Sequence, residues 1–390
     1  MPVWHELTRE LRESGELVVI GLIQEQHPKR CELYAQWQGL DWPILWDPFN
    51  LTGSKVVPNA IAIDEHGVVR QVGARSGNFM ESFMEKDFPA PESSQPKAFE
   101  ICAYGDQHGR DLGPLEQALR GQLDQAVQGF EAAVAAHPED GASAFRAGVA
   151  CRMRYDSAGR QPDDFQRAVD HWTQALFLDP NQYIWRRRIQ QYGPRMDKPY
   201  PFYSWIAQAG RELRARQQVP VKLLVELTAS EVAEPSRPEP SPNGPAAGDK
   251  RVAPKDPEGR ITRDAKGLIQ LESALAFDTS AKRDVGVLHL AFRPNPLHQA
   301  HWNHESGSAL EVWLEAPTGW SLSQAYMASD PPFRGLPSSE VQHWSPEVRL
   351  PEGQSSGTLR GHALYYVCEG ASGACLYLRQ DFEVAVQRPQ

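Results

Sequence analysis

Apolar positions in the first third of the chain switch between helical spacing and strand-like runs. Leu7 and Leu11 recur at helical spacing until Gly15, and residues 17–23 then form a continuous apolar run. A short apolar run bounded by turn residues is typical of a parallel strand that is covered on both faces. We therefore predict an α/β domain over residues 1–85, with further helices at 28–39 and 51–56 and further strands at 41–47, 57–64 and 68–73.

The middle of the chain, residues 110–230, is helical by its spacing and contains a repeat. A set of four residues has counterparts 42 positions later: Ala126, Phe130, Ala133 and Pro138. The counterparts are the same residue types, except that Trp172 takes the place of Phe130. Small alanines let two helices approach closely, the aromatic side chain fills the groove, and proline ends the helix. The pattern resembles the second helix of the tetratricopeptide repeat (TPR), whose period of about 34 residues implies an insertion, which we place at 155–163.

Residues 231–260 are rich in proline, serine and glycine, and we predict that they form a disordered linker. After it, residues 261–390 contain short apolar segments separated by clusters of breaker residues, which predicts a β-sandwich. Its clearest strands are expected at 268–276, 284–293, 309–315, 361–368 and 375–386. The predicted fold class is a multidomain chain: an α/β part, a TPR-like helical part and a β-sandwich.

Charge and composition exclude several classes of function. The net charge is −10 and the isoelectric point is near 5.7, which argues against nucleic acid or an anionic membrane as a partner. The first residues lack the basic and apolar segments of a secretory signal, so the sequence as given predicts a protein of the cytoplasm. If the true start lies upstream, a periplasmic or secreted location is possible. The chain has no phosphate-binding loop or dinucleotide fingerprint, so we expect no cofactor.

The segment 57–70 carries the most specific motif of the first domain. It reads VPNAIAIDEHGVVR: a strand that begins at a proline, a tight turn and a returning strand. With the elements before it, this motif resembles the redoxin group of thioredoxin-like proteins over residues 2–75. The resemblance implies that the Val57–Pro58 bond is cis and that Pro58 faces a redox site; the alternative is an ordinary edge-strand proline.

The chain departs from the redoxin pattern where the chemistry would lie. The family's Cys-x-x-Cys motif ends a strand just before the first helix, and this sequence starts at that helix. Either the start lies at an internal methionine of a longer reading frame, or the domain has lost the chemistry. We favour the first explanation, because a domain without its central strand would expose a long apolar sheet edge.

Cys31 is a candidate reactive thiol in the first domain. It follows Lys29 and Arg30 near the predicted start of a helix. A helix N-terminus and neighbouring cations lower the pKa of a thiol, which would suit a resolving or sensor cysteine. The alternative is a half-buried helix cysteine that faces the sheet.

Cys368 and Cys375 are the only two of the five cysteines that lie close together in the sequence. They flank a six-residue loop of a predicted hairpin, where a pair can approach disulfide geometry. The region loosely resembles the β-sandwich of some thioredoxin-domain proteins and the periplasmic sensor domain of thiol-disulfide interchange proteins, whose cysteine pair shuttles electrons. A redox-active pair, a static disulfide and reduced thiols stay open, although exposure favours redox activity.

Two polar clusters are weaker candidates. Three adjacent arginines on a predicted helix are candidates for binding an acidic partner, or else form a solvated helix surface: Arg186, Arg187 and Arg188. Three histidines recur at every third position of a predicted loop: His298, His301 and His304. That spacing does not bring three rings together in an extended loop, so we expect polar loop residues and no metal site.

These residues predict a redoxin-family thiol-disulfide oxidoreductase or antioxidant-type protein. TPR-like repeats would bind a protein partner, and a thiol or disulfide would be the substrate, exchanged through a mixed disulfide. Without an N-terminal Cys-x-x-Cys, the catalytic candidates are Cys368, Cys375 and Cys31, and whether the chain is an enzyme stays open. The rival hypothesis is a non-catalytic adaptor that uses a degenerate thioredoxin fold and TPR-type repeats as binding surfaces.

Overall fold

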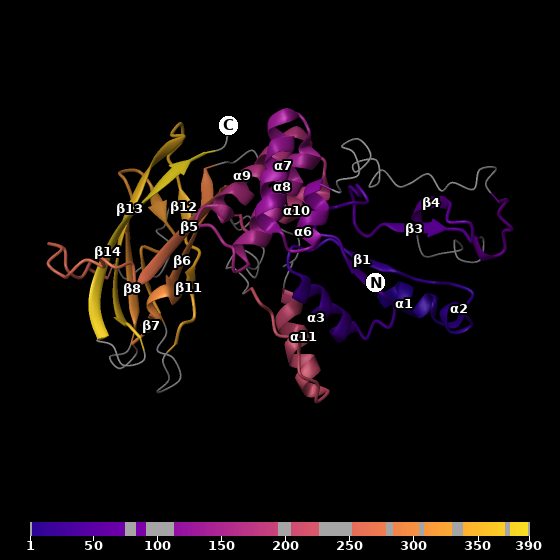
Figure 1. Ribbon diagram of the computed structural model, residues 1–390, viewed down its shortest axis with the longest axis horizontal. Coiled ribbons are helices and arrows are strands. Elements are labelled where there is room, and N and C mark those ends of the chain that lie inside the picture. The colour runs from indigo at the N-terminus through magenta and orange to yellow at the C-terminus, as the bar shows by residue number, and fades with distance from the viewer. Residues whose placement is uncertain are drawn as a thin grey trace, which may run out of the picture. The chain divides into compact units, whose positions relative to one another are not determined.

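The computed structural model describes residues 2–74, 83–90, 113–193, 204–225, 252–277, 284–303, 308–329, 338–370 and 375–388. Over these residues the protein is mixed α/β, with helices and several separate sheets (Figure 1). Its contacts divide the chain into two compact units. The first comprises residues 1–159, 174–188 and 203–226, and the second comprises residues 160–173, 189–202 and 227–390.

The first unit opens with two short helices and a parallel strand pair. The helices are α1 (Pro2–Leu7) and α2 (Arg9–Glu13), and they are followed by β1 (Gly21–Ile23), α3 (Pro28–Gln38) and β2 (Ile44–Trp46). β1 and β2 pair in parallel, which confirms the predicted orientation. Helix α3 begins at Pro28, and proline suits this position because the first amide groups of a helix have no hydrogen-bond partner within the helix. The helix ends at Gly39, which adopts the left-handed conformation with φ 61°.

A hairpin follows in the first unit, formed by β3 (Ala60–Ile63) and β4 (Val69–Ala74). The Asp64 carboxylate closes its turn by accepting hydrogen bonds from the amides of His66 and Val68. The Val57–Pro58 bond is cis, as the resemblance implied. Residues 51–56 form turns, so the predicted helix there is wrong; the positive φ of 62° at Gly53 is incompatible with a helix.

Apolar side chains on these small sheets are exposed. Val18 and Ile20 are 77% and 57% exposed, so the prediction that residues 17–23 are covered on both faces is wrong. Within the described ranges, β1 pairs only with β2 and β3 only with β4, so each sheet has two strands and no further strand to bury its apolar side chains. Six more apolar side chains of these strands are exposed: Leu22, Leu45, Ile61, Ile63, Val69 and Val72.

Helices make up the middle of the chain: α6 (Gly113–Leu119), α7 (Leu123–Ala136), α8 (Gly141–Tyr155), α9 (Asp164–Leu178), α10 (Tyr183–Gln190) and α11 (Ser204–Ala215). Asp140 caps α8 by accepting a hydrogen bond from the amide of Ala142. The gap between α8 and α9 falls where the insertion was predicted. The repeated aromatic residues Phe130 and Trp172 are both fully buried, which explains why the pattern needs them.

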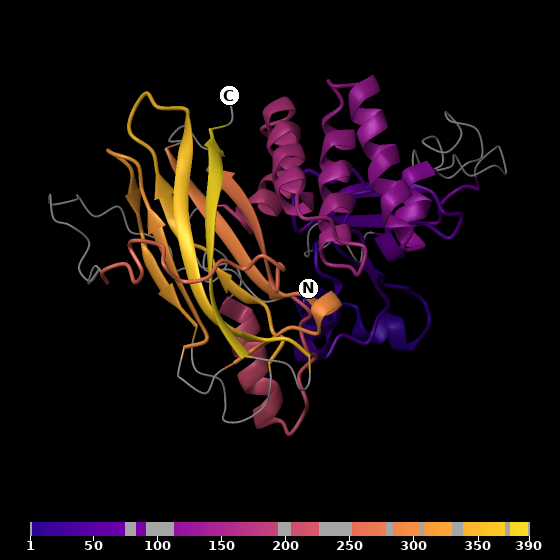
Figure 2. The same cartoon turned by 60° about the vertical axis from the view of Figure 1, so that its left-hand side comes forward.

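The strands of the second unit form two five-stranded sheets. One contains β10 (Tyr326–Ala328), β8 (Leu310–Glu315), β13 (Ser356–Cys368) and β14 (Cys375–Gln387) in this order, with β7 (His301–Trp302) also paired to β13. The other contains β11 (Gln342–Trp344), β6 (Val285–Pro294), β12 (Glu347–Arg349) and β9 (Ser321–Leu322), with β5 (Ile269–Phe277) paired to β6. All these pairs are antiparallel, and Figure 2 shows β13 and β14 as the long yellow pair.

Both sheets of the second unit contribute to one hydrophobic core. Leu288, Leu290 and Phe292 of β6 belong to the same buried cluster as Val312 of β8 and Tyr365 of β13. Each of these side chains is at most 1% exposed. Because alternate residues of a strand face opposite sides, residues such as Tyr366 and Cys368 of β13 project from the other face of their sheet.

The end of the predicted linker is ordered in the second unit. Asp256 accepts a hydrogen bond from the Arg379 guanidinium, and the Asp264 amide donates to the Arg379 carbonyl. Residues 226–251, the greater part of that linker, lie outside the described residues. Among the helices in the described ranges, none combines the length and the apolarity that a membrane span requires.

Candidate functional site

The most reactive chemistry of the described chain lies at the end of the β13–β14 hairpin. The ladder between these strands runs without a shift from Ser356 opposite Gln387 to Cys368 opposite Cys375. Directly opposed residues of antiparallel strands project from the same face, so the two thiols meet. They form a disulfide, with their Cα atoms 4.0 Å apart. The structure thus brings together the pair that the sequence singled out.

The two sulfurs differ in their access to solvent. Cys375 is an exposed residue, whereas Cys368 is only 5% exposed. A nucleophile from solution therefore reaches the Cys375 sulfur more readily than the Cys368 sulfur. An exposed disulfide is more open to exchange than one that is enclosed in a core.

A histidine completes a row across three strands. His301 of β7 lies directly opposite Cys368 on the other side of β13, so His301, Cys368 and Cys375 project from one face of the sheet. The half-buried His301 ring has Nδ1 3.4 Å from the carbonyl oxygen of Gln299. Because a carbonyl only accepts, this contact favours the neutral tautomer with its proton on Nδ1, in which Nε2 is the acceptor nitrogen.

An aromatic pair lies on the same face, two positions along the strands. Tyr366 and Tyr377 are directly opposed and stack, with ring centroids 4.3 Å apart. Burial, followed by the neighbouring Tyr366, raises the pKa of Tyr377 to about 12, so the phenol stays protonated at neutral pH. These rings give a partner a flat apolar contact beside the disulfide.

Charged groups surround the start of the loop after β13. The Glu369 carboxylate binds the Lys266 ammonium at 2.6 Å and lies 3.7 Å from Nδ1 of His298. Both carboxylate contacts are partly exposed to solvent. The charge of Glu369, the residue that follows Cys368, is thus engaged by this ion pair.

Cys31 does not have the environment that the sequence suggested. It is the fourth residue of α3 and is 6% exposed. Burial, followed by the Glu25 carboxylate, raises the pKa of its thiol to about 12, against the lowering expected at a helix N-terminus. The prediction of a reactive Cys31 is therefore wrong, because the dry environment outweighs the nearby cations.

The three adjacent arginines of α10 do not form one surface. Arg188 is 1% exposed, and its guanidinium donates hydrogen bonds to the side-chain oxygen of Gln26 and the carbonyl of Pro48. It also lies over the Phe145 ring, 5.3 Å from its centroid. Arg188 thus holds the first unit together and is not open to a partner, while Arg186 and Arg187 are half-buried.

Pro58, the proline expected to face a redox site, is exposed in the first unit. The preceding Val57 is 53% exposed. Of the five cysteines, the first unit contains Cys31, Cys102 and Cys151, and Cys102 lies outside the described residues. The role expected for Pro58 stays a prediction.

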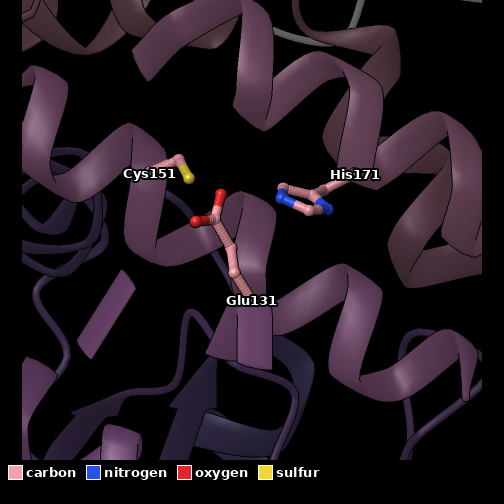
Figure 3. Close-up of side chains that lie close together, drawn as sticks. All are labelled: Glu131, Cys151 and His171. Carbon is pink, nitrogen blue, oxygen red and sulfur yellow. The ribbon is translucent and has the colours of Figure 1, made fainter. Parts of the chain in front are cut away.

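One further grouping of possible ligands occurs on the helices. Figure 3 shows Glu131 of α7, Cys151 of α8 and His171 of α9, three residues of the types that can bind a metal ion. The sequence analysis did not single out these residues. Glu131 and Cys151 belong to the first unit and His171 belongs to the second, and we assign no function to this grouping.

A shallow cavity of about 330 Å³ lies on the outer side of β13 and β14. Its charged lining mixes three acidic residues with two arginines: Glu315, Asp381, Glu383, Arg360 and Arg379. His362, which also lines it, has its pKa lowered by burial. These opposite charges largely pair with one another, so the cavity indicates no particular class of ligand.

Comparisons with known proteins add no family to this picture. No protein-family model matches the chain, and no curated protein matches it in sequence. The functional argument therefore depends on the hairpin disulfide and its neighbours. Sequence reasoning found both cysteines but missed the part of His301, since only the strand register places that ring beside Cys368.

Proposed function

We propose that the protein takes part in thiol-disulfide exchange through Cys368 and Cys375. The observation that supports this most is the disulfide between directly opposed residues at a hairpin end, with Cys375 exposed. Exposed disulfides that close short loops can be opened without unpacking a core. The core residue next to the pair, Val367, faces the other side of the sheet and keeps its contacts when the disulfide opens.

The exchange is a two-step transfer with a dithiol as the reductant. A thiolate of the dithiol attacks the Cys375 sulfur, a new S–S bond forms, and the bond to Cys368 breaks with its electron pair on the Cys368 sulfur. The second thiol of the dithiol then displaces Cys375. The protein gains two thiols, and the dithiol becomes a disulfide. In the reverse direction the reduced pair reduces a substrate disulfide.

The rest of the chain fits this proposal. We interpret the two sheets that share one core as a β-sandwich, the setting in which the sequence resembled redox sensor domains. The parallel strand pair and the hairpin after Pro58 are parts of the redoxin-like pattern. The helices α7 to α10 would supply TPR-like surfaces that bind a protein partner. Together these assignments describe a redox protein with a partner-binding middle region.

The test is whether the native protein exchanges this disulfide. The protein is incubated with a dithiol under native conditions, trapped with an alkylating reagent, and mapped by peptide mass spectrometry. We expect Cys368 and Cys375 to become alkylated while Cys31 stays protected by burial. A C368S variant should form a stable mixed disulfide at Cys375 with a disulfide-containing substrate, which releases one thiol as the Cys375 thiolate attacks it. A disulfide that reacts only when the second unit is unfolded by denaturant would refute the proposal.

The first unit supports a second candidate function, a non-catalytic adaptor that binds an extended peptide. Each of its small sheets has two strands, and β1 carries the exposed Leu22. An extended peptide can pair with an open strand edge through its backbone while its side chains cover the apolar face. The preferred ligand would alternate apolar and polar residues and carry no proline.

Substitutions on β1 test this adaptor function. Leu22→Lys places a charge on the exposed face of β1 and should abolish binding of such a peptide, measured by titration calorimetry. Leu119→Lys is the matched control, because Leu119 is a similarly exposed leucine on α6. Equal binding by both variants would exclude β1 as the binding edge.

A further inference from the structure

The row formed by His301, Cys368 and Cys375 supports a more detailed inference about the proposed exchange, and this inference rests on that exchange. We propose that His301 is the proton donor for the Cys368 sulfur when an incoming thiolate attacks Cys375. The inference rests on three features of the structure. They are the register across three strands, the difference in exposure of the two sulfurs, and the orientation of the His301 ring.

The strand register brings the imidazole to the correct sulfur. Directly opposed residues of antiparallel strands have Cβ atoms roughly 5 Å apart. Cys368 has such a neighbour on each side, Cys375 on β14 and His301 on β7. Cys375 lies one strand further away from His301. The imidazole therefore acts on Cys368, the sulfur that leaves, and does not block access to Cys375.

The leaving sulfur needs a proton because it is buried. Cys368 is 5% exposed, and a thiolate that forms away from water is disfavoured. Transfer of a proton from Nε2 of the imidazolium to the Cys368 sulfur gives a neutral thiol and a neutral imidazole. In the reverse direction the imidazole accepts this proton and generates the thiolate that attacks a substrate disulfide. The Gln299 carbonyl lies 3.4 Å from the other nitrogen, Nδ1, and so favours the form in which Nδ1 keeps its proton.

Other titratable groups near His301 are less suited to this transfer. Glu369 follows Cys368 in the chain, but its carboxylate is engaged by Lys266 and lies beside His298. Tyr377 faces the same side of the sheet, but its raised pKa of about 12 makes it a poor acid. The other contacts of β7 are made by Trp302, which pairs with Val367 and Ser338, donates to the Glu340 carbonyl and packs against the Tyr365 ring. Trp302 follows His301 in the strand, so its side chain projects from the opposite face of the sheet. Among the described residues, His301 is the histidine that the strand register places in one row with Cys368 and Cys375.

The experiment compares reduction rates by a dithiol as a function of pH. The full chain is used as wild type, H301Q and the matched control H298Q, whose histidine lies in the same segment and contacts Glu369. Thermal unfolding first checks that each variant is folded. Because attack by the dithiol depends on its own ionisation equally in all variants, the ratio of wild-type to variant rate isolates the contribution of the protein.

We expect H301Q to slow reduction roughly tenfold to a hundredfold at pH 6, within the range of a general acid. The ratio should fall towards one as the pH rises, because a neutral imidazole has no proton to donate from Nε2. H298Q should match wild type at every pH. A third variant, H301K, keeps a positive charge over this range, so the rate of H301K itself should lack the pH dependence that His301 gives to wild type.

Three negative results are distinguishable. A wild-type disulfide that no dithiol reduces in the folded protein would overturn the proposed exchange itself. A disulfide that is reduced equally fast in wild type and H301Q across the pH range would overturn the role of His301 and leave the exchange intact. An equal effect of H298Q and H301Q would assign the pH dependence to the charge around Glu369 instead.

Discussion

Removing the disulfide should destabilise the second unit by an amount that follows from the length of the loop it closes. Cys368 and Cys375 are separated by seven positions, so the bond closes a loop of about eight residues. The loop-closure relation gives about 2.5 kcal/mol for this length at 25 °C. For a unit of this size, about 2–4 °C of melting temperature per kcal/mol predicts a decrease of about 5–10 °C. The β13–β14 ladder itself should survive.

The assay is calorimetry on wild type and on the double variant C368S/C375S without reductant. Near-ultraviolet circular dichroism then checks that the core is intact. Reduction of wild type supplies the internal control, because a dithiol should shift wild type by the same amount and leave the variant unchanged. Unfolding of the second unit on reduction would refute the reasoning, since the pair would then hold the core together. No shift at all would show that the bond does not form in solution.

Three further outcomes follow from the packing. G361A should cost about 1–3 kcal/mol, because a Cβ there would lie 2.5 Å from the Phe382 ring. G159A should be neutral in urea unfolding, because its Cβ would make only an ordinary contact, 3.7 Å from the Ser157 hydroxyl oxygen. Alkylation of the Cys31 thiol in the native protein should be far slower than that of a free thiol, since its pKa is raised to about 12; rapid labelling would contradict its burial. Burial lowers the pKa of His27 from 6.5 to about 4. As the pH drops through this range, the unfolded state therefore binds a proton before the folded state does. The free energy of unfolding should fall by up to about 3 kcal/mol between pH 6.5 and pH 4. Replacing His27 by glutamine should flatten that part of the pH profile, and an unchanged slope would show that another group is responsible.

Local patterns predicted the strands of the second unit well. The segments 361–368 and 375–386 were expected as a hairpin, and β13 and β14 extend over 356–368 and 375–387. Alternating side chains and a loop of breaker residues define such a pair locally. The predicted helix at 51–56 failed because the turn at Gly53 overrides a short apolar pattern.

The candidate site was only partly predictable. Two cysteines that flank a short loop can be recognised in sequence, and the disulfide confirms that they meet. The position of His301 depends on the pairing of β7 with β13, about 67 positions apart in the chain, and no local pattern determines that register. The burial of Arg188 was missed for a similar reason, because its partners Gln26 and Pro48 come from the far end of the first unit.

The open edges of the first unit also have a consequence for work with the purified protein. Val18 and Ile20 lie just before β1, without a strand or helix to cover them in the described ranges. Uncovered strand edges recruit one another at high concentration, so self-association and precipitation should increase with protein concentration. The substitution V18K places a charge beside this strand edge and should raise solubility without altering the hairpin disulfide, so it offers a practical starting point for crystallisation.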